Sequence, residues 1–246
     1  MSLTPRFTTT AIVPARNEAA CIGEVVSGLL RQTHVHGLPL IDDVVVADNG
    51  SSDGTARAAR IAGATVADVP PPGYGRACFE AAQASSGEVL LFVDGDGAAD
   101  PADAASLLAA IAGGADLAIG IRTQPERGAM SVTQRFGNAL ACALMRALWG
   151  MPAVDLGPYR AIRRSAFEQL DMRDRAFGWT AEMQVRAHLL GLRVAQRPVA
   201  WRARRSGRSK ISCTLLGVMR AGCGILGVIA ALCWRERRRG LIWKSV

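Results

Sequence analysis

The first half of the chain alternates between short apolar runs and longer stretches in which apolar residues recur at helical spacing. Short apolar runs bounded by turn residues predict strands, and they cover residues 9–13, 43–47, 64–69, 88–93 and 117–120. The stretches between and beside them predict helices at residues 18–32, 51–62, 75–85 and 101–111. Strands that alternate with helices predict an α/β fold with a doubly wound, mostly parallel sheet flanked by helices.

The second half has a less regular pattern. It predicts helices at 132–149 and 180–190, an extended segment at 155–162 and a strand at 194–201. An apolar stretch at 213–234 precedes a basic tail. We therefore expect one α/β domain over residues 1–212 and a separate apolar helix with a basic tail over residues 213–246.

Polar residues follow several of the predicted strands directly. Asn17 and Glu18 follow the first strand, Asp48 ends the second, and Asp94 and Asp96 follow the fourth. In an open parallel sheet, ligands bind at the carboxyl ends of the strands, which share one edge. The sequence therefore predicts a ligand site at this edge.

The segment Asp94-Gly95-Asp96 carries the most specific chemistry. Two carboxylates one residue apart, at the end of a buried strand, can hold one hard divalent cation together with diphosphate oxygens. The alternative is a loop with solvated acids, because two aspartates at this spacing are common. The position after a strand that is apolar beyond its first residue, Glu88, favours a metal site with Asp94 and Asp96 as ligands.

The turns after the first two strands leave two interpretations open. The stretch Pro14-Ala15-Arg16-Asn17-Glu18 can bind a base and a ribose, or it can form an ordinary turn in which Asn17 or Glu18 caps the next helix. Asp48 can recognise a base or form an Asx turn with the residues that follow it.

Several stretches resemble a known family. PARNE, VVVADNGSSDGT, GYGRA and FVDGDG, in this order and spacing, resemble the family 2 glycosyltransferases of GT-A fold. Later in the chain, IGIR, RFGNAL, DLGPYRAIRR and RRSGRSK are similar to the dolichyl- and polyprenyl-phosphate sugar synthase branch. The resemblance covers about residues 9–215. Ala98 and the tetrapeptide Gly157-Pro158-Tyr159-Arg160 depart from the branch pattern, where glutamine and Ser-Gly-Phe-Arg are usual.

The resemblance implies an inverting transfer of a sugar from a UDP- or GDP-linked donor to a polyprenyl phosphate or a related acceptor, with Mg²⁺ or Mn²⁺ as cofactor. It implies donor contacts from Pro14, Ala15, Asn17, Glu18, Asp48, Arg76, Asp94, Gly95 and Arg122, with the acceptor phosphate as the alternative partner of Arg122. It implies contacts with the acceptor or with phosphates from Arg135, Arg204, Ser209 and Lys210.

The expected reaction displaces the nucleoside diphosphate at the anomeric carbon, with the cation at Asp96 and arginines neutralising the charge of the leaving group. A lipid phosphate is already anionic and needs no strong base, whereas an alcohol acceptor needs a carboxylate to take its proton. Glu182 is the first candidate for this base and Asp155 the second. The alternative for Glu182 is an acid in the first turn of a helix, where the helix dipole favours it.

The two halves of the chain differ in charge. Residues 1–120 contain 6 basic and 14 acidic side chains, and residues 121–246 contain 23 basic and 7 acidic ones. A basic surface can bind phosphates, nucleic acid or an anionic membrane. Few aromatic residues lie among the arginines, so we expect no nucleic acid partner.

The apolar stretch at 213–234 is interrupted by Arg220, and an arginine near the middle of a membrane span costs roughly 2.5–3.5 kcal/mol. We expect this helix to lie on the inner face of the membrane, with the protein in the cytoplasm and no signal peptide. The alternative is a core helix with a basic end.

Two other functions compete with the glycosyltransferase: a nucleotidyltransferase that makes an activated sugar, and a non-catalytic basic module on a membrane surface.

Overall fold

The computed structural model describes residues 7–34, 37–203 and 215–238. Its strands are β1 (Thr9–Ala15), β2 (Asp43–Asp48), β3 (Thr65–Asp68), β4 (Val89–Phe92), β5 (Leu117–Ile121), β6 (Arg160–Arg163) and β7 (Val194–Pro198). Its α-helices are α1 (Ile22–Leu30), α2 (Thr55–Ile61), α3 (Tyr74–Ala84), α4 (Ala104–Ala112), α5 (Val132–Trp149), α6 (Arg164–Gln169), α7 (Trp179–Leu189) and α8 (Leu215–Arg238). A short 3₁₀ turn, Pro101–Asp103, leads into α4.

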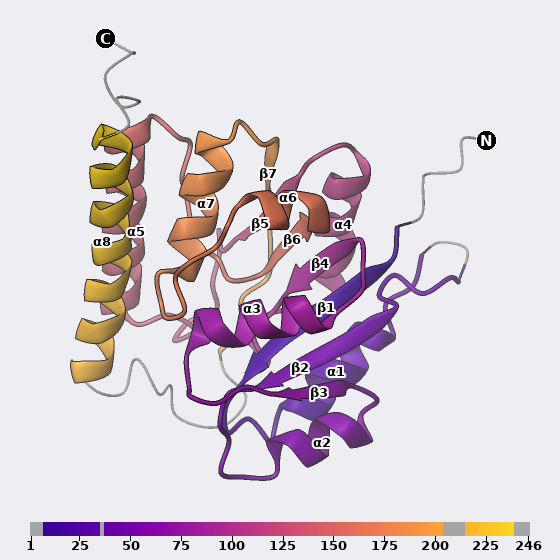
Figure 1. The fold of residues 1–246 in the computed structure, drawn as a ribbon. Coiled ribbons are helices and arrows are strands. Elements are labelled where there is room, and N and C mark those ends of the chain that lie inside the picture. The colour runs from indigo at the N-terminus through magenta and orange to yellow at the C-terminus, as the bar shows by residue number, and fades with distance from the viewer. Residues whose placement is uncertain (1–6, 35–36, 204–214, 239–246) are drawn as a thin grey trace.

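The seven strands form one sheet in the order β3-β2-β1-β4-β6-β5-β7, and helices cover both of its faces (Figure 1). The first four strands pair in parallel, and β7 is parallel to β5. Only β6, among the strands described, runs antiparallel to its neighbours, β4 and β5. The predicted mostly parallel α/β fold is therefore confirmed. The antiparallel direction of β6 was not predicted, because the pattern indicated only an extended segment there.

Both faces of the sheet are buried, which explains why β4 has no polar position. Leu91 packs into a cluster with α1 and α4 on one face, and Leu90 packs with α3, α6 and α7 on the other. Trp179 at the start of α7 lies in the second cluster, with its ring 6.0 Å from that of Phe92. These two layers hold the carboxyl ends of β1 and β4 in fixed positions.

Helix α8 packs against α5 and α7, at the side of the molecule away from β1–β3 (Figure 1). Its residues Ile229 and Leu232 share a buried cluster with Cys142 and Met145 of α5. On the side that faces α5 and α7, α8 is therefore packed like a core helix, which was the alternative interpretation. The helix packs against the domain and is not a separate unit as we expected. In the part of the chain that the structure describes, no helix is both long and apolar enough for a bilayer crossing.

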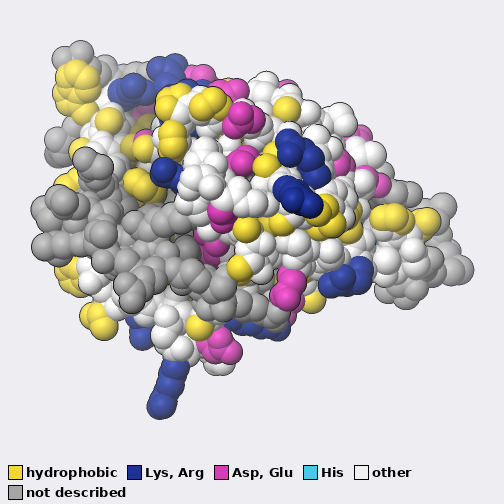
Figure 2. All heavy atoms as spheres, turned by 90° about the horizontal axis from the view of Figure 1, so that it is seen from below, with side chains coloured by type: hydrophobic (Ala, Val, Ile, Leu, Met, Phe, Trp, Pro, Cys, Tyr) yellow, Lys and Arg dark blue, Asp and Glu magenta, His cyan; other side chains and the backbone are white. Residues whose placement is uncertain are grey.

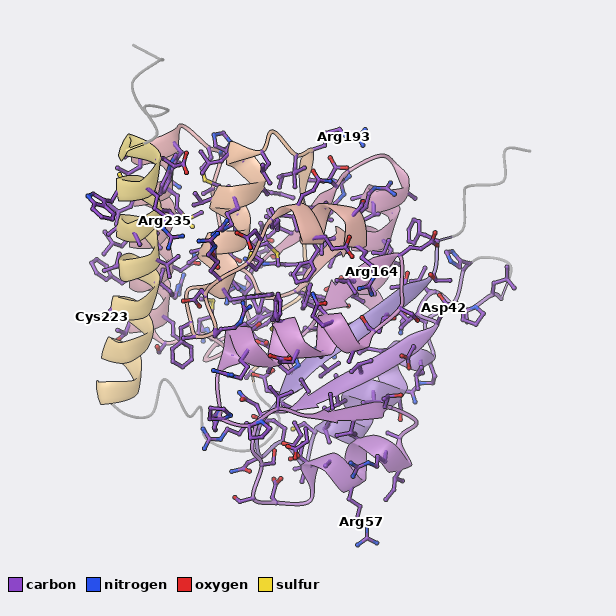
Figure 3. The ribbon with its side chains drawn as sticks, viewed as in Figure 1. Asp42, Arg57, Arg164, Arg193, Cys223 and Arg235 are labelled. Carbon is purple, nitrogen blue, oxygen red and sulfur yellow. The ribbon has the colours of Figure 1, made fainter. Side chains whose placement is uncertain are left out.

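Two adjacent arginines, Arg163 and Arg164, lie at the junction of β6 and α6, and their side chains bond within the fold. Arg163 donates to the carbonyl oxygen of Ile111 at 2.6 Å, and Arg164 donates to that of Ala82 at 3.1 Å. Both guanidinium groups therefore satisfy carbonyls in the last turns of α4 and α3. Figure 3 shows Arg164 near the end of α3.

Candidate active site

A cavity of about 300 Å³ opens at the carboxyl ends of β1 and β4. Seen from below in Figure 2, acidic side chains lie near the middle of the molecule. The cavity is lined by Pro14, Ala15, Arg16, Glu18, Asn49, Pro72, Gly73, Tyr74, Asp94, Gly95, Asp96, Ala176 and Phe177. The structure thus places five of the predicted donor residues around one cavity: Pro14, Ala15, Glu18, Asp94 and Gly95.

The two aspartates of the predicted metal pair both line this cavity. Asp94 accepts a hydrogen bond from the Tyr74 hydroxyl at 3.1 Å, and Asp96 accepts one from the Ala98 amide at 3.0 Å. Asp96 is only 5% exposed. Gly95 between them allows the segment after β4 to approach the end of β1 closely, because a Cβ there would lie 3.1 Å from the Cβ of Ala15. A larger residue would require the neighbouring groups to shift by a few tenths of an ångström.

The donor set fits a hard cation that is shared with a substrate. The described residues contain no cluster of three or more His, Cys, Asp or Glu side chains that could enclose a metal by themselves. Mg²⁺ in phosphate-transfer sites is commonly held by one or two carboxylates, with substrate phosphates and water completing its shell. Asp94 and Asp96 supply two such carboxylates at an open cavity, so the predicted site would depend on a bound diphosphate.

Asn17 and Asp48 lie beside the cavity but do not line it. Asn17 adopts a left-handed conformation (φ 51°) and accepts a hydrogen bond from the Ser52 amide at 2.7 Å. Asp48 accepts one from the Ser51 amide at 2.9 Å, which is the local turn interaction left open by the sequence. These two side chains therefore hold the loop after β2 in place, and Asn49 of that loop is the residue that reaches the cavity.

Arg76, in the first turn of α3, is also absent from the lining of this cavity. Its amide donates to the carbonyl of Arg175 at 3.0 Å. This bond ties α3 to the loop before α7. A direct contact between the Arg76 side chain and the donor stays a prediction.

A second cavity of about 190 Å³ lies at the end of β5, between the α5 helix and the loop before β6. Its polar lining consists of Arg122, Thr123, Arg135, Asn138 and Asp155. The guanidinium of Arg122 is bonded to both carboxylate oxygens of Asp155, at 2.6 and 2.9 Å. The same guanidinium lies 5.2 Å from the centre of the Trp201 ring. Arg122 is therefore held in one orientation at the cavity wall.

Comparison with known proteins identifies the family. The family model described as glycosyl transferase family 2 matches residues 10–171, more than half of the chain. The chain belongs to glycosyl transferase family 2. This result supports the enzyme over both the nucleotidyltransferase and the non-catalytic module.

This family 2 glycosyltransferase has relatives that match most of its length. It is 32% identical over 209 residues to an uncharacterized glycosyltransferase of Mycobacterium tuberculosis, covering 85% of this chain and 91% of the relative. It is 30% identical over 224 residues to a dolichyl-phosphate hexose transferase of Haloferax volcanii, covering 91% of this chain and 92% of the relative.

Solved structures share the fold. The glucosyl-3-phosphoglycerate synthase of Mycobacterium tuberculosis, in complex with Mn²⁺, UDP and glucosyl-3-phosphoglycerate, superimposes with a TM-score of 0.75 at 23% identity. The match covers 93% of this chain and 80% of that one. The same enzyme has been crystallised with Mg²⁺ and UDP. The expected divalent cofactor, Mg²⁺ or Mn²⁺, is consistent with these neighbours.

Asp155 does not have the properties of the base that the sequence suggested. Burial by itself raises the pKa of Asp155, but the hydrogen bonds and the charge of Arg122 outweigh this effect and hold the pKa below its ordinary value. A carboxylate that stays ionised and is bonded through both oxygens to an arginine is a poor proton acceptor. Asp155 instead orients Arg122.

Glu182 is also engaged elsewhere. Its buried carboxylate accepts hydrogen bonds from the amides of Arg173 and Asp174, at 3.0 and 2.7 Å, and from the side chain of Arg186 at 2.8 Å. It lines neither of the two cavities. The geometry therefore does not fit the predicted role of Glu182 as the base. Its contacts make Glu182 a structural residue that fixes the loop before α7.

We expect Glu182→Ala to lower the free energy of unfolding by about 3–5 kcal/mol, because it leaves Arg186 and two amides without their buried partner. Chemical denaturation measures this change. Glu168→Ala, at an exposed position of α6, is the control and should leave stability nearly unchanged. If Glu182→Ala kept its stability but lost turnover, Glu182 would be the base after all.

Some residues of the site had no clear signal in the sequence. Tyr74 lies within the GYGRA stretch, but nothing in the pattern showed that its hydroxyl reaches Asp94. Ala176 and Phe177 reach the cavity from a loop before α7 that carries no motif.

The predicted acceptor and phosphate contacts have different outcomes. Arg135, which was among them, lines the second cavity as part of α5. The predicted phosphate contacts Arg204, Ser209 and Lys210 lie outside the described residues.

Proposed function

We propose that this family 2 glycosyltransferase moves a sugar, with inversion, from a UDP- or GDP-linked donor to a lipid phosphate, in a reaction that depends on Mg²⁺ or Mn²⁺. The observation that supports a lipid phosphate as the acceptor is an exposed apolar face on α5. Arg135, which lines the second cavity, lies on the same helix. The donor and the acceptor parts of the proposal rest on different cavities.

The first cavity suits the donor. Asp94 and Asp96 would hold the cation, which when bound neutralises charge on the departing diphosphate. Glu18 and Asn49 offer polar groups on the β1 and β2 side, where a base and a ribose can be bound. The volume of about 300 Å³ is at the lower end of the range for small-molecule sites.

The second cavity suits a phosphate monoester. Arg122 and Arg135 bring two guanidinium groups to its wall, and Asn138 and Thr123 add neutral polar groups. Asp155 keeps Arg122 in place before the acceptor arrives, which reduces the ordering cost of binding. A phosphate acceptor is anionic already, so the lack of an available base among the two predicted carboxylates does not hinder the reaction.

The apolar face of α5 favours a lipid over a soluble acceptor. Val132 and Phe136 are 84% and 68% exposed, and Leu140 continues the same face at four-residue spacing. Leu226 and Trp234 of α8 are exposed as well. Exposed apolar groups that share one face are typical of membrane or lipid contact. A small acceptor such as the phosphoglyceric acid of the structural neighbour would make no use of this face. Peripheral contact with the inner face of the membrane is part of this proposal.

The experiment offers the purified protein UDP- and GDP-sugars with Mn²⁺ and two acceptors, polyprenyl phosphate in anionic vesicles and 3-phosphoglycerate in solution. We expect labelled sugar to appear in the lipid phase. Phe136→Asp should reduce transfer to the vesicles and vesicle binding by about tenfold or more, since it puts a charge on the face that contacts lipid. Glu168→Asp on α6 serves as the surface control. Transfer to 3-phosphoglycerate alone, or full activity of Phe136→Asp on vesicles, would overturn the lipid assignment.

A further inference from the structure

The chain contains two tyrosines, and one of them reaches the metal pair. Tyr74 is the first residue of α3, and its half-buried side chain lines the first cavity. Its hydroxyl donates to Oδ1 of Asp94 at 3.1 Å. Asp94 lies at the end of β4, so this bond links the start of α3 to the predicted donor site across the rim of the sheet.

The Tyr74 hydroxyl is the donor in its bond to Asp94, because a carboxylate oxygen can only accept. The bond therefore has one direction, from the start of α3 to the residue that follows β4.

The backbone around Tyr74 is held by two other segments that also line the cavity. A Cβ at Gly73 or Gly75 would lie 2.5 or 2.6 Å from a carbonyl oxygen of the loop before α7. The Gly75 amide donates to the carbonyl of Ala176 at 3.0 Å, and the Gly73 amide donates to the side chain of Asn49 at 2.7 Å. Two lining segments of the cavity thus hold the first turn of α3, and the Tyr74 side chain packs against the buried cluster that contains Phe92 and Trp179.

From this arrangement we propose that Tyr74 is a positioning residue of the donor site. Its hydroxyl fixes the orientation of the Asp94 carboxylate, so that this carboxylate meets the cation and the diphosphate without reorganising first. The inference rests on the proposed function, because it takes Asp94 and Asp96 to hold the cation. Tyr74 itself takes no part in bond making or breaking.

The test is Tyr74→Phe, which removes one oxygen and keeps the ring. Isothermal titration of UDP and of GDP into wild-type protein, with and without Mn²⁺, identifies the nucleotide and its dissociation constant. We expect Tyr74→Phe to weaken nucleotide binding in the presence of Mn²⁺ by about tenfold, the loss expected for one hydrogen bond to a charged group. Without Mn²⁺ the variant and the wild type should differ by less than about twofold. Turnover at saturating donor and Mn²⁺ should change little.

Tyr159→Phe is the matched control. Tyr159 is fully buried, its hydroxyl donates to the Pro101 carbonyl at 3.4 Å, and it lines neither cavity. This variant reports what the loss of a tyrosine hydroxyl does to the fold alone, and it should bind nucleotide and Mn²⁺ as the wild type does. Equal weakening in both variants would overturn the inference.

The outcome also separates the inference from the proposed function. If wild-type protein binds nucleotide more tightly with Mn²⁺ and Tyr74→Phe does the same to the same degree, Tyr74 has no positioning role and the metal site stands. If Mn²⁺ does not strengthen binding to wild-type protein, the metal site itself is wrong and the inference fails with it. A Tyr74→Phe protein that loses affinity equally with and without Mn²⁺ would also contradict the role at Asp94.

Discussion

Asp96→Asn should lower kcat/KM for sugar transfer by roughly a thousandfold while the protein stays folded. Asparagine has the same shape and can still accept the hydrogen bond from the Ala98 amide, so this contact is kept. It lacks the negative charge that a divalent cation requires. A cation that stabilises a leaving diphosphate contributes several kcal/mol, and each 1.4 kcal/mol corresponds to tenfold in rate.

The control for this variant is Asp68→Asn. Asp68 ends β3 at the same edge of the sheet, but it is exposed and does not line the cavity. Its replacement should leave the kinetics within about twofold of wild type. Steady-state rates over a range of Mn²⁺ concentrations measure both variants. If Asp96→Asn turned over as fast as the wild type, Asp96 would not hold a catalytic cation.

The second large effect concerns Arg122. Replacing Arg122 alone would leave the buried charge of Asp155 without its partner, which costs about 3–5 kcal/mol of stability. This loss of stability would obscure the effect on acceptor binding. The double variant Arg122→Gln with Asp155→Asn removes both charges and keeps two groups that can bond to each other. We expect it to lower kcat/KM for a lipid phosphate by about a hundredfold, mainly through a higher KM, because hydrogen bonds from a guanidinium to a phosphate are lost.

Arg127→Gln is the matched control, because Arg127 is an exposed arginine near the second cavity that does not line it. It should keep an acceptor KM close to that of wild type. The donor KM of the double variant should change little, since Arg122 does not line the first cavity. If the double variant raised the donor KM and left the acceptor KM unchanged, Arg122 would belong to the donor diphosphate instead.

The sequence was sufficient for the parallel part of the sheet and for the position of Asp94 and Asp96, but not for the antiparallel direction of β6. A strand without a polar residue must be buried on both faces, and a strand buried in this way ends at an edge where ligands gather. The two aspartates follow such a strand, so their place at the cavity depends on local pattern and topology alone. The same reasoning placed Pro14 and Glu18.

The remaining roles depend on contacts between segments that are distant in the sequence. Glu182 resembles an ordinary acid at the start of a helix until the Arg173 and Asp174 amides are seen to approach it. Asp155 is paired with Arg122, 33 residues earlier, which no periodicity reveals. Conversely, Tyr74 lies in the GYGRA stretch, but only the distance from its hydroxyl to Asp94 points to a role for that hydroxyl.

The most direct test of the proposed metal site is a crystal structure of the protein grown with UDP or GDP and Mn²⁺, with anomalous diffraction used to locate the manganese. We expect one strong manganese peak in the first cavity, bound by carboxylate oxygens of Asp94 or Asp96 and by oxygens of the diphosphate. Nucleotide bound with no manganese within coordination distance of either aspartate, or manganese at a different place in the protein, would contradict it.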